Sequence, residues 1–246
     1  MKTTLFPIMA LAILGACTGM THAATLVTYT FPSGAATPTT VDSSVTASSV
    51  SLGTTSAGNF GFSSIASNFY SRLQSPPPNP TYQLPTTLAG ATTGQTYIEF
   101  TLTPQAAQTL NLSNLKVDLS AQNTSGAAAY YDYTFYADLQ VTINGVMSDL
   151  GSVSYTALAG AGDTVYPASN KTFDLSSSTF QGVTDPITFR LLVYRDPAST
   201  SNYYETIRLD NISVNTVPEP TSIALMILGC GLLLVSQRQR ALRLDS

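Results

Sequence analysis

Apolar and polar residues alternate over several short stretches in the central part of the chain. In the clearest stretch, 97–102, Ile98, Phe100 and Leu102 share one phase and polar residues take the other. A side-chain period of two is typical of a β-strand that buries one face. The same alternation predicts further strands in 25–31, 41–52, 110–119, 130–143, 151–157, 186–194 and 205–215.

Turn residues separate these stretches, and two positions carry specific signals. Asn144-Gly145 is typical of a two-residue hairpin turn. In the last stretch the apolar phase slips at Asp210 and Asn211, which predicts a β-bulge. No window sustains an apolar stripe with helical period over a useful length. The pattern therefore predicts an all-β protein, an antiparallel β-sandwich most similar to a jelly roll.

The N-terminal residues are typical of a secretory signal peptide. Lys2 precedes an apolar run at 5–14, and small or polar residues follow as far as Ala23. That run is too short to span a membrane, so 1–23 is predicted to be a signal helix that is cleaved on export. Cys17 ends a Leu-Gly-Ala-Cys sequence, which leaves processing as a lipoprotein as the alternative.

The C-terminal segment, 216–246, has three parts in order. A Pro-Glu-Pro precedes an uncharged run that predicts a hydrophobic helix at 221–236, and a basic end follows. The uncharged core of that helix rises about 20 Å, so flanking polar residues and snorkelling arginines must help it to span a bilayer. Positive charges beyond it predict a cytoplasmic C-terminus. The basic residues are Arg238, Arg240 and Arg243.

This order of parts resembles the PEP-CTERM sorting signal of exported proteins in Gram-negative bacteria that make exopolysaccharide. The resemblance implies that an exosortase, a membrane enzyme similar to cysteine transpeptidases, processes the chain at Val217, Pro218, Glu219 and Pro220. It also implies a transient anchor in the inner membrane and then delivery to the cell surface or the extracellular space. The alternative is an ordinary single-span anchor. The closing stretches 186–194 and 205–215 resemble jelly-roll passenger domains of the same proteins.

Between the two ends lies a predicted passenger domain, 24–215, whose composition excludes much chemistry. It has no Cys, His or Trp. Catalysis by Ser–His–Asp or Cys–His groups and zinc sites of Cys and His are therefore excluded. Its twelve acidic and six basic residues give a difference of −6, which argues against nucleic acid as a partner. We expect a passenger that is not an enzyme.

Two binding hypotheses and one catalytic hypothesis remain. Tyrosines suit sugar stacking because they combine an apolar face with a polar tip. The candidate glycan contacts are Tyr130, Tyr136, Tyr203 and Tyr204, although alternate tyrosines also fill cores. Glu99 and Glu205 are the passenger's glutamates and offer a carboxylate pair for glycoside cleavage, provided that the fold brings them together.

Calcium enters through a resemblance. Jelly-roll carbohydrate modules often hold a structural Ca²⁺ near their first and last strands, and an Asp of the closing strand is a ligand. Asp210 matches that position. Because Ca²⁺ needs six to eight oxygens, the alternative is that Asp210 satisfies backbone groups at the bulge. No other cofactor is expected.

The sequence thus predicts an exported protein of the cell envelope or extracellular matrix. Its role is structural or adhesive, in an exopolysaccharide biofilm. The first alternative is a glycan-binding protein similar to carbohydrate-binding modules. The second is a glycoside-cleaving enzyme.

Overall fold

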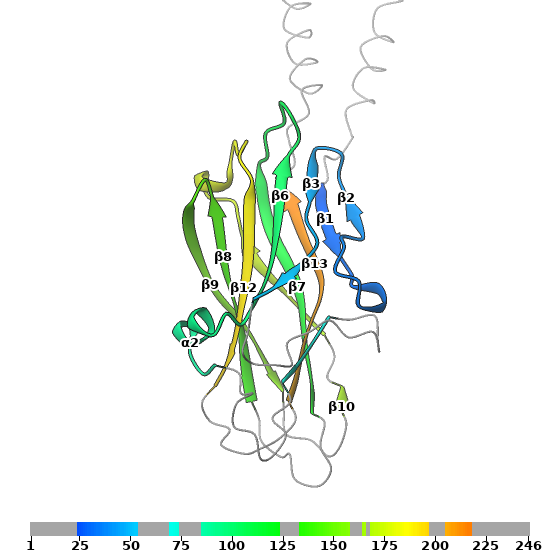
Figure 1. Ribbon diagram of the computed structural model, residues 1–246, viewed down its shortest axis with the longest axis vertical. Helices are drawn as coiled ribbons and strands as arrows, with labels where there is room; N and C mark the ends of the chain where they lie inside the picture. The colour runs from blue at the N-terminus through cyan, green and yellow to red at the C-terminus, as the bar shows by residue number, and fades with distance from the viewer. Residues whose placement is uncertain are drawn as a thin grey trace, which may run out of the picture. The chain divides into compact units, whose positions relative to one another are not determined.

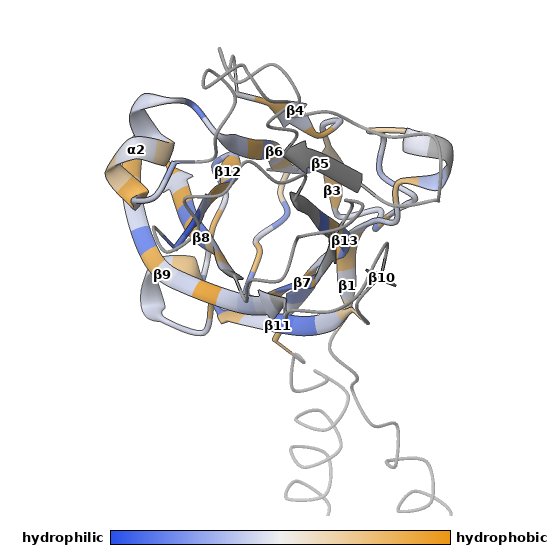
Figure 2. Cartoon of the chain, turned by 90° about the horizontal axis from the view of Figure 1, so that it is seen from below, coloured by the Kyte–Doolittle hydropathy of each residue, from blue (hydrophilic) through white to orange (hydrophobic). Residues whose placement is uncertain are grey.

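The computed structural model describes residues 24–53, 69–73, 85–123, 133–157, 164–165, 168–196 and 205–217. Within them, two antiparallel sheets pack face to face, as the view along the strands in Figure 2 shows. The predicted all-β sandwich is confirmed. Among the described residues, no helix is both long and apolar enough to cross a membrane. The two predicted terminal helices lie outside the described residues.

The first sheet, sheet A, has the order β10-β7-β13-β1-β2, with β11 also pairing with β7 and β5 with β13 (Figure 1). Its strands are β1 (Thr25–Tyr29), β2 (Thr40–Val41), β5 (Phe69–Leu73), β7 (Leu112–Asn123), β10 (Thr164–Val165), β11 (Ser169–Asp174) and β13 (Glu205–Thr216). The last described strand, β13, therefore lies in the middle of this sheet, between β7 and β1.

The second sheet, sheet B, has the order β3-β6-β12-β8-β9, with β4 also pairing with β6. Its strands are β3 (Val45–Ala47), β4 (Ser51–Leu52), β6 (Tyr97–Pro104), β8 (Tyr133–Ile143), β9 (Val146–Ala157) and β12 (Ile187–Arg195). Three short helical segments complete the described elements: η2 (Pro32–Gly34), α2 (Leu88–Thr93) and η3 (Ser178–Phe180).

The core forms where the apolar phases of the two sheets meet. Ile98, Phe100 and Leu102 are all buried, as their shared phase predicts. Phe100 packs against Tyr29 of sheet A at a ring-centroid distance of 4.9 Å and against Phe189 at 5.1 Å. The Tyr29 hydroxyl donates a hydrogen bond to the Ser48 carbonyl at 2.7 Å, so its polar tip is satisfied inside the core.

The predicted hairpin and bulge are both present. Asn144 and Gly145 have positive φ angles of 50° and 76° and join β8 to β9, which is the conformation that a type I′ turn requires. On β13 the register with β7 shifts between Asp210 and Ser213. Asn211 has a positive φ of 49° there, as befits the extra residue of a bulge.

The short helix α2 is a feature that the sequence pattern does not predict. The Thr87 hydroxyl caps it by accepting from the Gly90 amide at 3.0 Å. Contacts between α2 and β12 place the helix on the outer side of sheet B (Figure 2). Ala91 and Leu192 are fully buried but stand apart from the main core cluster. Six residues are too few for a helical period to emerge from a sequence.

Candidate functional site

The structure describes part of the predicted site set. Glu99, Tyr136 and Asp210 are described, and so is Val217, the last described residue. The other predicted residues fall outside the described ones, or their side chains do, and they remain predictions. These are Tyr130, Tyr203, Tyr204, Pro218, Glu219, Pro220, Arg238, Arg240, Arg243 and the side chain of Glu205.

Tyr136 belongs to a group of tyrosines on the outer surface of sheet B. Its neighbours Phe135 and Ala137 are buried in the core, so Tyr136 itself points away from the core. Register pairs it with Tyr194 of β12, and the two rings stack with centroids 5.0 Å apart and planes 15° from parallel. Tyr97 of β6 has the same outward phase and pairs with position 192 of β12.

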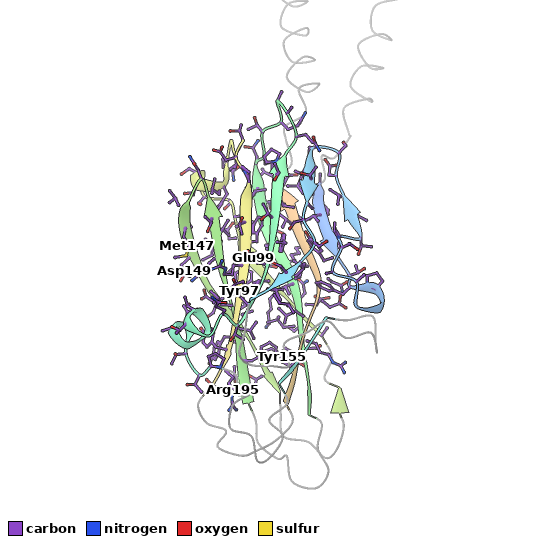
Figure 3. The ribbon with its side chains drawn as sticks, viewed as in Figure 1. Tyr97, Glu99, Met147, Asp149, Tyr155 and Arg195 are labelled. Atoms are coloured by element: carbon purple, nitrogen blue, oxygen red, sulfur yellow. The ribbon has the colours of Figure 1, made fainter. Side chains whose placement is uncertain are left out.

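We call this surface the tyrosine face. It comprises the outward-facing side chains of β6, β12, β8 and β9 together with Asp196, which directly follows β12. Its members that carry the argument are Tyr97, Glu99, Tyr136, Asp138, Gln140, Asp149, Arg190, Tyr194 and Asp196, while Leu192 between them is fully buried on the strand that α2 contacts. Figure 3 shows Tyr97 and Glu99 on β6, with Asp149 on β9 at the edge of the sheet.

An arginine is fixed in the middle of this face. The Nε and Nη2 atoms of Arg190 donate to Glu99 Oε2 at 2.8 and 2.6 Å. The guanidinium carbon also lies 4.2 Å from the centre of the Tyr97 ring, a cation–π contact. The Glu99 carboxylate, one half of the predicted catalytic pair, is therefore engaged in an ion pair.

The two stacked tyrosines have a carboxylate at one end. The Tyr136 hydroxyl donates to Asp196 Oδ1 at 2.9 Å. That hydrogen bond raises the pKa of Tyr136, because it stabilises the protonated phenol. Tyr136 is thus held in place by stacking on Tyr194 and by a charge-assisted hydrogen bond to Asp196.

A second carboxylate, Asp138, lies two residues further along β8 in the same phase. It is only 2% exposed, and its Oδ1 has no hydrogen-bond partner among the described residues. Burial, together with the nearby Asp149 charge, raises the pKa of Asp138 to about 6. Asp149 lies at a bulge of β9, where its Oδ1 accepts from the Gly151 amide at 2.8 Å.

The predicted calcium ligand Asp210 lies on the other sheet. Its Oδ1 accepts from the Asn211 amide at 2.7 Å, which is the local role at the bulge that the sequence offered as the alternative. Burial is the main cause that raises the pKa of Asp210, and the charge of its cross-strand neighbour Asp118 adds to it. Within the described part of the chain, no group of three or more His, Cys, Asp or Glu side chains could hold a metal ion. Calcium at Asp210 stays a prediction.

Most residues of the tyrosine face were not predicted as site residues, among them Tyr97, Asp138 and Tyr194. Their signal was present, since each occupies the polar phase of a strongly alternating strand. That phase identifies an outward-facing residue but does not say which strand lies beside it. Only the strand order β6-β12-β8 brings the three together.

No protein-family model matches the chain, and neither does any curated protein. Among solved structures, the K3 adhesin domain of Lys-gingipain from Porphyromonas gingivalis W83 is 15% identical with a TM-score of 0.37. That match covers 79% of this chain and 100% of that one. The CBM22-2 xylan-binding domain from Paenibacillus barcinonensis is 7% identical with a TM-score of 0.31, covering 78% and 99%.

A third similar structure is the family 11 carbohydrate-binding module from Clostridium thermocellum, in complex with a mixed-linked tetrasaccharide. It is 11% identical with a TM-score of 0.28, and the match covers 80% of this chain and 99% of that one. At these identities and TM-scores, none of the three structures assigns a family or a ligand to this chain.

Proposed function

We propose that this chain is an exported, non-enzymatic protein of the cell surface or extracellular matrix that attaches to polysaccharide through the tyrosine face. The observation that carries the proposal is the stacked pair of Tyr136 and Tyr194, with Tyr97 on the same outer surface. Half-exposed aromatic rings offer apolar surface to the C–H face of a sugar, and their hydroxyls offer hydrogen bonds.

The polar groups beside the rings support the same proposal. Arg190 is fixed by Glu99 and Tyr97 before any ligand arrives, so its remaining donors cost little conformational entropy on binding. Gln140 of β8 lies opposite Arg190 on β12. Carboxylate, amide and guanidinium groups together supply both acceptors and donors for sugar hydroxyls.

Binding of the exported protein to immobilised polysaccharides tests the proposal. The host's own exopolysaccharide, dextran and galactomannan serve as probes. We expect binding that the double variant Tyr136→Ala, Tyr194→Ala weakens by at least about tenfold, or 1.4 kcal/mol. The matched double variant Tyr136→Phe, Tyr194→Phe keeps the stacking rings and retains most of the affinity.

Two outcomes count against the proposal. No retention of the wild-type protein on any of the polymers, with and without Ca²⁺, overturns it. If circular dichroism shows that the alanine variant is folded and it binds as tightly as wild type, the tyrosine face is not the binding site. A fall in the size of the polymer during incubation supports the glycoside-cleaving alternative instead.

The proposed route to the surface runs through the C-terminal segment. We propose that an exosortase processes the chain near Pro218, Glu219 and Pro220, and that the helix at 221–236 anchors it only transiently. Mass spectrometry of the exported form is expected to find no residues beyond about Pro220. Finding Arg243 in that form contradicts the processing step but leaves export and polysaccharide binding untouched.

A further inference from the structure

The charges on the tyrosine face are not balanced. Among its described side chains the charged ones are Glu99, Asp138, Asp149, Arg190 and Asp196. Arg190 is paired with Glu99. The next arginine of β12, Arg195, has the core-facing phase and is buried. Three carboxylates therefore remain on this face without a described lysine or arginine in an ion pair with them.

Two of these carboxylates flank the tyrosine pair. Asp196 Oδ1 accepts the hydrogen bond of the Tyr136 hydroxyl at 2.9 Å. Asp138 follows Tyr136 in the same phase of β8, and side chains two residues apart on a strand are separated by about 7 Å. A sugar ring held against this tyrosine pair therefore has the Asp196 carboxylate at one end, and the buried Asp138 and the exposed Asp149 lie beyond Tyr136 on the same face.

Carboxylates next to an aromatic platform select for one kind of sugar. They accept hydrogen bonds from hydroxyl groups, and such charge-assisted bonds are stronger than neutral ones. They repel a uronate or sulfate group at the same distance, because like charges in a partly desolvated site interact strongly. The remainder of the passenger adds to this repulsion, since its acidic residues outnumber its basic ones by twelve to six.

We propose that the ligand of the tyrosine face is a neutral polysaccharide rich in free hydroxyl groups, and that uronate-bearing and sulfated polymers are rejected. This rests on the proposed function and gives it a substrate class. Asp149 and Asp196 are the groups that set the selectivity from the exposed part of the face. Asp138 acts beside them from a buried position.

Paired binding measurements test this inference. The exported protein is titrated against dextran and glucomannan, which are neutral, and against polygalacturonate and alginate, which are acidic, in low salt with EDTA. We expect the neutral polymers to bind at least about tenfold more tightly. Raising the ionic strength to about 1 M, where the Debye length is about 3 Å, is expected to shrink that gap.

Isosteric variants assign the selectivity to named residues. The double variant Asp149→Asn, Asp196→Asn keeps an acceptor oxygen for the Gly151 amide and for the Tyr136 hydroxyl while it removes two charges. This variant is expected to reduce the ratio of neutral-polymer to acidic-polymer affinity by about threefold or more. The control Asp42→Asn, Asp174→Asn removes two charges that also accept a backbone amide two residues on, but outside the tyrosine face. This control is expected to leave the ratio of the two affinities unchanged.

The outcomes separate this inference from the proposed function. Absence of binding to any of the four polymers contradicts the proposed function itself. Equal or tighter binding of the acidic polymers in EDTA leaves polysaccharide binding intact and overturns the neutral substrate class. If the control variant reduces the difference in affinity as much as the Asp149 and Asp196 variant does, the selectivity is not set by these two residues.

Discussion

The outer faces of the two sheets differ in how their polar side chains are joined. On sheet A they satisfy one another: Thr25 Oγ1 donates to Asn215 Oδ1 at 2.8 Å, and Asn215 Nδ2 donates to Asn114 Oδ1 at 2.9 Å. Asp118 accepts from the Nδ2 atoms of Asn170 and Asn211 at 2.9 and 2.8 Å. These cross-strand ladders join β1, β13, β7 and β11, so this face serves the stability of the sheet.

On sheet B some outward side chains are also joined, Arg190 to Glu99 and Tyr136 to Asp196, but one buried acceptor is not used by the described residues. Asp138 Oδ1 has no described partner, and the stacked residues Tyr136 and Tyr194 are both partly exposed. A buried polar atom without a partner is destabilising, and such features persist where they serve a function. The cross-strand ladders of sheet A therefore contribute to stability, whereas the groups of the proposed binding site lie on sheet B.

The largest effect is expected at Asp138. Its pKa is raised to about 6 in the folded protein from 3.8, so the folded state holds this proton where the unfolded state has lost it. The stabilisation is therefore complete below pH 3.8 and is lost as the pH rises through about 6. Relative to Asp138→Asn, wild type is expected to lose about 2–3 kcal/mol of unfolding free energy between pH 4 and 7.

Urea unfolding of both proteins across that range, followed by circular dichroism, measures this difference. Parallel pH profiles for wild type and Asp138→Asn would show that the carboxylate does not stay protonated in the fold. Asp174→Asn is the control, because a hydrogen bond from the Ser176 side chain lowers the pKa of Asp174. Relative to Asp174→Asn, wild type should gain unfolding free energy as the pH rises, the opposite of its comparison with Asp138→Asn.

A smaller effect is expected on the face of sheet A. Asn215→Ala removes the central member of a part-buried ladder and leaves the Thr25 hydroxyl and Asn114 without it. We expect a loss of about 1–2 kcal/mol of unfolding free energy, with polysaccharide binding unchanged. Thr172→Ala, at an exposed position of the same face, should change stability by less than about 0.5 kcal/mol. Impaired binding in Asn215→Ala would contradict the division of labour between the faces.

The smallest effect is expected at the ion pair of the tyrosine face. The side chains of Arg190 and Glu99 are 37% and 26% exposed, and pairs this accessible contribute about 0.5 kcal/mol to stability. Glu99→Gln should therefore unfold at almost the same urea concentration as wild type. Its polysaccharide affinity should still fall, because Arg190 loses the partner that fixes it. A large loss of stability with unchanged binding would show that this ion pair has a structural role, as the ladders of sheet A do.

Much of the fold was readable from the sequence because a strand's side chains alternate strictly. The buried phases of β6, β8, β12 and β13, the turn at Asn144 and Gly145, and the bulge at Asp210 and Asn211 were all predicted, and all are present. The helix α2 was not predicted, because its six residues pack on sheet B through a single buried alanine, Ala91. The stretch 41–52 was expected to form one or two short strands, and it contributes to three, β2, β3 and β4.

The sequence by itself determined which side chains face away from the core, since burying the apolar phase forces the polar phase outward. It did not determine which outward residues meet. Tyr97, Tyr136 and Tyr194 come together only because β12 pairs with β6 on one side and with β8 on the other. Such pairings are backbone hydrogen bonds between segments far apart in the chain, and no local pattern encodes them. The tyrosine face, its fixed arginine and the carboxylates beside its tyrosine pair are therefore products of the tertiary structure.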